Sequence, residues 1–192
     1  MCGRYYIPEE DSAAELQAII DEINRKHGDT AIKTGEIRPT DVAPVIANSR
    51  SMVASAFAMR WGYSMLDGKT AFNARSETAA TRPMFQDGMS QRRCLVPAAY
   101  YFEWEKRGKE RVKYAIGQDG CRVLYMAGIY RIEHGIPAFT ILTRTPANNI
   151  SSIHDRMPVI LPIEAKADWL NPKFMADEII RAAVMDVHFQ AV

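Results

Sequence analysis

The sequence predicts an α+β fold: a single domain, residues 1–192, in which a barrel-like, largely antiparallel β-sheet core is flanked by short helices. Two observations favour this fold. Short apolar or alternating runs follow one another through the middle of the chain, separated by turn signals such as RGK at 107–109 and DG at 119–120. Helical patterns do not alternate regularly with these runs, which argues against a parallel α/β fold.

The first expected element is a helix over residues 11–26. Leu16, Ile19 and Ile23 recur there at helical spacing, and Ser12 begins a capping-box pattern. The expected strands cover residues 42–47, 53–60, 93–96, 100–104, 112–116, 122–130 and 137–144. Shorter helices are expected near residues 82–90, 146–152, 163–170 and 175–183.

The composition limits the kind of protein. Of 192 residues, 47% are apolar and 24% charged, and the net charge of +1 argues against a general polybasic nucleic-acid binder but leaves room for a small basic groove. Residues 9–11 are acidic where a signal peptide needs an apolar run, and no apolar stretch reaches membrane-spanning length. The cysteines at positions 2, 94 and 121 form neither a spaced metal motif nor an even disulfide set. We therefore expect a cytoplasmic protein without a metal site or membrane contact.

Cys2 is the most informative residue of the chain. If Met1 is removed, Cys2 carries a free α-amine and a thiol on adjacent carbons. This pair condenses with an aldehyde to a five-membered thiazolidine, or serves as nucleophile and base in an N-terminal hydrolase. Gly3 leaves space beside such a nucleophile, and Arg4 is a candidate to hold an anion next to it. The alternatives are a chance cysteine and an ordinary surface arginine.

The segment FNARSET at 72–78 places an amide, a guanidinium and a carboxylate after an apolar residue. In a strand, alternation puts Asn73, Arg75 and Glu77 on one face, where they form a candidate polar site. The alternative is a strand end that runs into a helix, with a hydroxyl residue of the segment as its cap.

Two further ionisable residues lie in unusual surroundings. Glu103 sits in the aromatic stretch YYFEW at 100–104, where desolvation raises the pKa of a carboxyl group toward the acid–base range. The alternative is a solvated Glu103 that points outward from an edge strand. His154 lies in the polar cluster IHDRMPV at 153–159, where a histidine can move protons near neutral pH, although a lone histidine is more often structural or exposed.

Together these segments resemble the SOS response-associated peptidase (SRAP) family. The resemblance extends over residues 1–161. It lies in MCGR at 1–4, RWGY at 60–63, FNARSET at 72–78, YFEW at 101–104 and IHDRMPVIL at 153–161, which follow the family's order and approximate spacing. It implies the family's activity, which is to recognise abasic sites in single-stranded DNA and to trap the ring-opened sugar aldehyde as a thiazolidine on the N-terminal cysteine.

The resemblance also implies residue roles. The catalytic set would be the nucleophile Cys2, Asn73 to orient its amine, and Glu103 and His154 to move protons at the sugar. The DNA-binding set would be Arg4, Arg75 and Arg156, with Trp61 against a base near the lesion. The implied partner is single-stranded DNA with abasic sites, bound by a monomer without a cofactor. Autoproteolysis that exposes Cys2 and lyase-type strand cleavage are implied alongside.

Two other functions remain open. Glutamine amidotransferases with an N-terminal cysteine also begin Met-Cys-Gly, but their usual continuation is apolar where this chain has Arg4, and a glutamine-clamping arginine–glycine motif is missing from the sequence. The other function is that of a non-covalent single-stranded DNA-binding module in which Cys2 is incidental. Ammonia release from glutamine would identify the first, and a DNA complex that detergent dissolves would identify the second.

Overall fold

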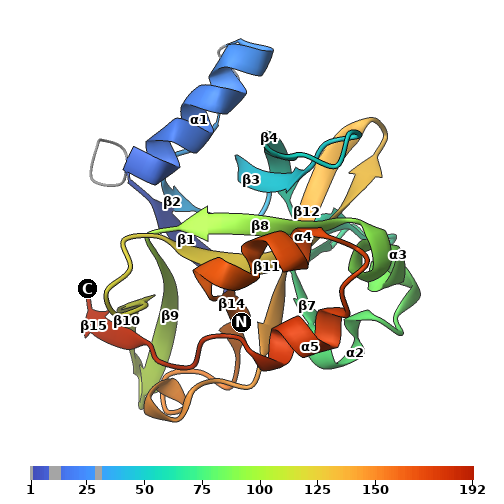
Figure 1. Ribbon diagram of the computed structural model, residues 1–192. Coiled ribbons are helices and arrows are strands. Elements are labelled where there is room, and N and C mark those ends of the chain that lie inside the picture. The colour runs from blue at the N-terminus through green and yellow to red at the C-terminus, as the bar shows by residue number, and fades with distance from the viewer. Residues whose placement is uncertain (1, 9–13, 29–31) are drawn as a thin grey trace.

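A five-stranded barrel lies at the centre of the computed structural model, which describes residues 2–8, 14–28 and 32–192 (Figure 1). Its strands are β3 (Val42–Asn48), β4 (Ala54–Trp61), β8 (Arg93–Ala98), β11 (Leu124–Glu133) and β12 (Ile136–Arg144). Strand β12 pairs with both β11 and β4 and thereby closes the ring. Four of the five pairings in this ring are antiparallel and β12–β4 is parallel, which confirms the prediction of a barrel-like, largely antiparallel core.

Inward-facing apolar side chains fill the barrel. Each strand contributes a buried residue to one apolar cluster: Val45, Met59, Val96, Met126 and Ile141. Strand β11 passes so close to its neighbours that residue 128 has no room for a side chain. A Cβ on Gly128 would lie 2.9 Å from Cys94 Sγ and 3.2 Å from the carbonyl oxygen of Thr140. The barrel is therefore packed so tightly that a single added methyl group matters.

A second sheet of five antiparallel strands packs against the barrel and contains the N-terminal strand. Its order is β15 (His188–Ala191), β10 (Glu110–Gly117), β9 (Tyr100–Arg107), β1 (Arg4–Ile7) and β2 (Gly35–Ile37). Tyr5, Tyr101 and Ile116 lie on its inner face and join the apolar cluster of the barrel. Because β1 pairs with both β9 and β2, the residues just before β1 are held beside the middle of β9.

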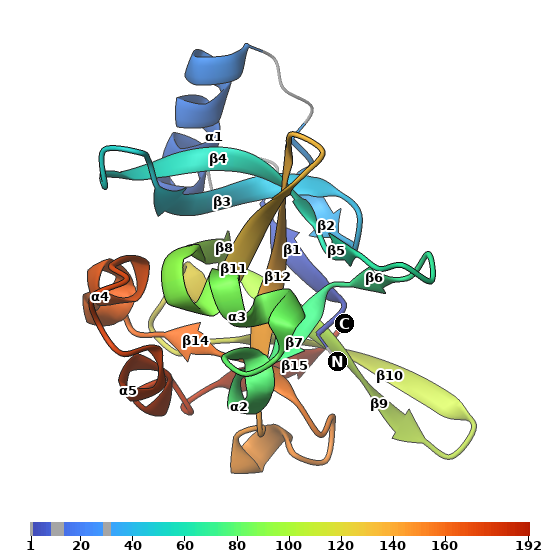
Figure 2. The same ribbon diagram turned by 90° about the vertical axis from the view of Figure 1, so that its right-hand side faces the viewer.

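Helices cover the outside of the barrel. Helix α1 (Ala14–His27) packs across β3 and β4, whereas α3 (Pro83–Gln91) and α4 (Lys166–Leu170) pack on β8 and, for α3, on β11 (Figures 1 and 2). Trp169 of α4 donates from Nε1 to the carbonyl oxygen of Cys94 at 2.9 Å. The remaining elements are β5 (Tyr63–Ser64), β6 (Thr70–Ala71), β7 (Asn73–Arg75), α2 (Ser76–Ala79), η1 (Asn148–Ile150), β13 (Met157–Pro158), β14 (Ile160–Leu161), η2 (Ile163–Ala165) and α5 (Ala176–Arg181).

Most of the longer elements agree with their expected bounds to within a few residues. The helix expected over residues 11–26 is α1, whose expected cap Ser12 lies outside the described residues. Strands β1, β2 and β7 escape prediction because three or four residues are too few to show a period. Within the described ranges no helix is long and apolar enough to cross a membrane.

Replacing Gly128 with alanine tests the packing of the barrel. The added methyl group meets Cys94 and the backbone of Thr140, so we expect the free energy of unfolding to fall by about 1–3 kcal/mol. Urea unfolding followed by circular dichroism measures this loss. An unchanged midpoint would show that the barrel relaxes to admit the methyl group.

Candidate functional site

Two adjacent strands bring the N-terminal thiol next to a buried carboxylate. Arg4 of β1 pairs with Phe102 of β9, so Cys2 lies beside the part of β9 that carries Glu103. Both side chains are buried: Cys2 is 0% exposed and Glu103 is 3% exposed. Met1, whose removal the aminothiol chemistry requires, lies outside the described residues.

Burial and charge repulsion set the protonation of these two groups. Burial raises the pKa of the Cys2 thiol well above its ordinary value, and the charge of Glu103 raises it further. Burial also raises the pKa of Glu103, to about 7. A carboxyl group with this pKa gives and takes protons near neutral pH. The alternative of a solvated Glu103 on an edge strand is excluded, because β9 is paired on both sides.

Asn73 is bound to the backbone of Cys2. Its Nδ2 donates to the carbonyl oxygen of Cys2 at 2.8 Å. Strand β7 holds Asn73 in place because it pairs in parallel with β12, where Asn73 lies opposite Ile141. Asn73 Oδ1 is buried and meets no hydrogen-bond donor in the part of the chain that the structure describes. The side chain of Asn73 therefore binds the backbone of Cys2 through Nδ2, while its Oδ1 can accept a hydrogen bond from a further group.

His154 approaches Glu103 from the loop between η1 and β13. Its Nε2 lies 3.9 Å from Glu103 Oε2, and its Nδ1 accepts a hydrogen bond from the backbone N–H of Arg156 at 3.0 Å. The ring nitrogen Nε2 is the one that faces Glu103. Burial lowers the pKa of His154 and outweighs the opposite effect of the Asp155 carboxylate, which lies 2.8 Å from Nδ1. A neutral imidazole next to a carboxyl group of pKa about 7 provides a short path for a proton.

The segment 72–78 changes from strand to helix after Arg75. Asn73 and Arg75 belong to β7, whereas Glu77 lies on α2, which begins without a side-chain cap. Glu77 forms a bidentate ion pair with Arg156, at 2.7 and 2.8 Å, and Arg156 is largely buried there. Glu77 therefore does not share a strand face with Asn73 and Arg75, although the sequence predicts that it does. Its ion pair with Arg156 instead connects α2 to the loop that carries His154.

The other two predicted arginines remain accessible. Arg4 donates to Glu36 at 2.6 Å and lies over the ring of Trp104, 5.0 Å from its centroid, with about a third of its side chain exposed (37%). Arg75 is exposed at the end of β7. Both guanidinium groups are therefore available to an anion that approaches the site.

Trp61 is a core residue. It is fully buried, its ring packs parallel to Phe139, and its Nε1 donates to the carbonyl oxygen of Phe72 at 2.8 Å. A ring without exposed surface cannot stack on a base, so the structure corrects the expected role of Trp61 to core packing. Trp104, partly exposed beside Arg4, is the aromatic ring that the structure places at the surface near the site.

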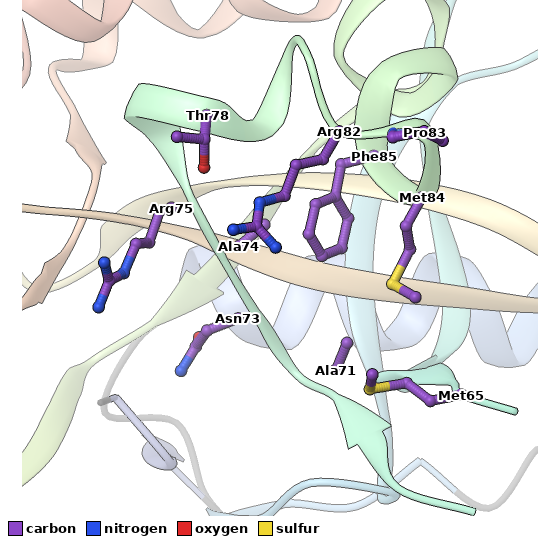
Figure 3. A pocket seen from close by; sticks show the side chains of 10 residues that line it. All are labelled: Met65, Ala71, Asn73, Ala74, Arg75, Thr78, Arg82, Pro83, Met84 and Phe85. Atoms are coloured by element: carbon purple, nitrogen blue, oxygen red, sulfur yellow. The ribbon is translucent and has the colours of Figure 1, made fainter. Parts of the chain in front are cut away.

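A pocket of about 570 Å³ opens beside Asn73 (Figure 3). Asn73 and Arg75 lie on one side of it, and Arg82 and Phe85 extend toward its centre from the chain around the start of α3. Arg82 is an exposed arginine before a proline, and nothing in its sequence surroundings distinguishes it from an ordinary surface residue. Among the described residues, no group of three or more His, Cys, Asp or Glu side chains is placed to hold a metal ion.

Solved structures share this fold over the whole chain. A protein from Bacteroides thetaiotaomicron matches with a TM-score of 0.81 at 21% identity and covers 100% of this chain and 92% of that one. A protein from Bordetella bronchiseptica matches with a TM-score of 0.78 at 22% identity, covering 100% and 99% of the two chains. The barrel with its second sheet is thus an established α+β architecture.

Sequence comparison gives the family. A family model described as SOS response associated peptidase (SRAP) matches residues 1–190. The chain is 32% identical over 191 residues to the abasic site processing protein YobE of Bacillus subtilis, covering 90% of this chain and 83% of that protein. It is 33% identical over 124 residues to the abasic site processing protein YedK of Escherichia coli, covering 62% and 56%. The chain belongs to the SRAP family, as its motifs indicate.

The raised pKa of Glu103 predicts that stability depends on pH. A carboxyl group with a pKa of about 7 in the folded protein and about 4.5 in the unfolded chain binds more protons when folded. The free energy of unfolding therefore falls as the pH rises from about 4.5 through about 7. Glu103→Gln removes this titration, so urea midpoints measured across this range should fall less steeply than in the wild type.

The exposed carboxylate of Glu110 on β10 provides the matched control. Glu110→Gln should keep the wild-type dependence of the midpoint on pH. Equal slopes in the wild type and in Glu103→Gln would contradict the assignment of this titration to Glu103.

Proposed function

We propose that this protein senses abasic sites in single-stranded DNA and shields them through a thiazolidine crosslink to Cys2, formed once Met1 is removed. The observation that carries the proposal is the convergence of Cys2, Asn73, Glu103 and His154 from four separate segments. Membership of a family with relatives named abasic site processing proteins supports the same substrate.

The aminothiol suits the chemistry of an abasic sugar. Such a sugar is mostly a closed hemiacetal and opens to an aldehyde before an amine attacks it. The α-amine of Cys2 adds to the aldehyde carbon and expels water to form a Schiff base. The thiol then adds to the same carbon while its proton passes to the nitrogen, so one C–N and one C–S bond form and one water leaves. Because amine and thiol belong to one residue, the second step is intramolecular.

The thiol also determines which product forms. A Schiff base that is not captured is open to β-elimination, which cleaves the DNA strand and corresponds to lyase activity. Capture by the Cys2 thiol removes the Schiff base and leaves the strand intact. The same nucleophile would take part in an autoproteolysis that exposes Cys2, a reaction compatible with the word peptidase in the family's name.

The neighbouring side chains supply protons and orientation. Glu103, with a pKa of about 7, would transfer the proton that opens the sugar ring and would relay the proton of the thiol to the nitrogen. His154, whose Nε2 faces Glu103, would return a proton to the sugar oxygen when the crosslink reverses. Asn73 Oδ1 would accept a hydrogen bond from the α-amine and direct its lone pair at the aldehyde.

Backbone contacts would hold the DNA without reading its sequence. Arg4 and Arg75 are accessible to the phosphates that flank the lesion, and Arg156 would add its charge from the ion pair with Glu77. Contacts to phosphates carry no sequence information, which suits a lesion that arises next to any base. We propose single-stranded DNA with an abasic site as the partner, bound by a monomer.

A denaturing gel tests the crosslink. Processed protein mixed with a single-stranded oligonucleotide that contains one abasic site should give a shifted band that survives heat and detergent. Cys2→Ala should abolish this band, whereas Cys121→Ala, which removes another free cysteine, should retain it. A complex that detergent dissolves, or a crosslink in Cys2→Ala through another residue, would refute the proposal. Ammonia release from glutamine would favour an amidohydrolase instead.

Kinetics separate the two proton-transfer residues. Glu103→Gln keeps the shape of the side chain but neither gives nor takes a proton, so we expect crosslink formation to slow by about 10²–10⁴-fold. His154→Ala should instead slow the release of a preformed crosslink. Quenched time courses of formation and release measure both effects. A wild-type rate of formation in Glu103→Gln would contradict the proposed role of Glu103, and a wild-type rate of release in His154→Ala would contradict that of His154.

A further inference from the structure

The sheet that carries β1 and β9 has a second face, which points away from the barrel. Register shows which side chains share it, because residues directly opposite each other on antiparallel strands point the same way. Tyr5 and Tyr101 form one opposite pair and point into the core. The alternate residues point outward, and we define the outer sheet face by six of them: Arg4, Tyr6, Tyr100, Phe102, Trp104 and Lys113.

Four aromatic rings form a continuous row on the outer sheet face. Tyr6 and Tyr100 stack with their centroids 4.9 Å apart and their planes 2° apart. Tyr100 meets Phe102 edge-on at 5.3 Å, and Phe102 meets Trp104 at 6.5 Å. Tyr6, Tyr100 and Trp104 remain partly exposed. Grouped aromatic rings on the solvent side of a sheet mark a binding surface, and sheets with such rings stack the bases of single strands.

The charge of this face is positive. Among the described residues of the five strands, the outward positions hold four basic side chains and one carboxylate, that of Glu36: the basic residues are Arg4, Lys106, Arg111 and Lys113. Glu36 binds Arg4 at 2.6 Å and Lys113 at 2.5 Å. Lys113 Nζ lies 3.7 Å from the centroid of Phe102. Glu36 also pairs with Arg38 at 3.2 Å, so one carboxylate faces three cations and cannot neutralise all of them. The surface therefore complements a polyanion.

Two hollows lie at opposite ends of the aromatic row. The first hollow has a volume of about 400 Å³ and is lined by Gly3, Arg4, Trp104 and Arg111. Gly3 directly follows Cys2 in the sequence. The second, of about 530 Å³, has Tyr6, Tyr100 and Arg122 among its lining residues. Trp104 and Tyr100 are four residues apart on β9, a distance of about 13 Å along a strand. The row therefore extends from the hollow around Gly3 and Arg4, the residues that follow Cys2, to the far end of the sheet.

We propose that the outer sheet face binds the single-stranded DNA that continues from the lesion. Bases stack on Trp104 and on the Tyr6–Tyr100 pair, and phosphates contact Lys113. The proposal rests on the proposed function in one respect, namely that the same strand carries the abasic site at Cys2. Binding by stacking and charge tolerates any sequence, and its strength depends on strand length and on salt.

Undamaged oligothymidylates test this face without any covalent step, because they contain no aldehyde. Fluorescence anisotropy should show tighter binding to a strand of about 15 nucleotides than to one of about 4, the range over which single-strand platforms differ. For the longer strand, Tyr6→Ala combined with Tyr100→Ala should weaken binding by about 10-fold. Lys113→Gln should reduce the slope of log affinity against log salt by about 0.7, the effect of one lost phosphate contact.

Two matched controls lie away from the outer sheet face. Phe189 is an exposed ring on β15 that lies opposite Ile116 and so belongs to the other face of the same sheet. Lys173 is an exposed cation beyond α4. Phe189→Ala and Lys173→Gln should keep the wild-type affinity and salt slope. Equal losses in these controls, or wild-type affinity in the double tyrosine variant, would overturn the proposal.

The salt slope decides the matter if the double tyrosine variant does not fold. An unchanged slope in Lys113→Gln would then overturn the proposal, and the expected decrease would support it. The two proposals also fail separately. A wild-type protein that binds undamaged strands through these residues but forms no crosslink refutes the thiazolidine function alone. A protein that forms the crosslink, but binds undamaged strands equally well when the residues of the outer sheet face are replaced, refutes only the proposal that this face binds DNA.

Discussion

The site depends on the position of β12 within the closed barrel. Parallel pairing with β7 places Asn73 opposite Ile141, and antiparallel pairing with β13 places Met157 opposite Arg144, just after the loop of His154. Strand β12 in turn is fixed by β11 on one side and β4 on the other. A one-residue slip would turn its buried face outward, so the register of a barrel strand is strongly specified. Strand β12 therefore determines where Asn73 and His154 lie, two of the four residues that converge at the site.

The pairing of β1 with β9 determines the other two. Burying an acid and a thiol side by side is unfavourable, and the raised pKa values of Glu103 and Cys2 reflect that cost. The backbone hydrogen bonds of the sheet and the apolar inner face around Tyr5 and Tyr101 stabilise the arrangement in return. Successive residues of β9 also face different surroundings, because Glu103 points inward to the buried site and Trp104 points outward to the surface of the sheet.

The longer strands are predictable from sequence because their period and turn signals are local. Strands β4, β11 and β12 contain eight to ten residues with clear apolar character. The short strands β1 and β7 become strands through partners that are distant in sequence, as the pairing of Asn73 with Ile141 shows. Trp61 shows that the exposure of a side chain likewise depends on partners that are distant in sequence. Its residue type suits base stacking, but packing against Phe139 removes its ring from the surface.

By itself, the sequence determined the available chemistry and the family: an aminothiol precursor at Cys2, an amide at Asn73, an acid at Glu103 and an imidazole at His154, within motifs in a recognisable order. Only the tertiary structure decided that these groups meet, because they lie far apart along the chain and converge when the barrel closes and β1 joins β9. It also decided their protonation. The aromatic neighbours of Glu103 in the sequence predict a raised pKa but leave open a solvated side chain, and the packed fold decides between the two by burying the carboxyl group.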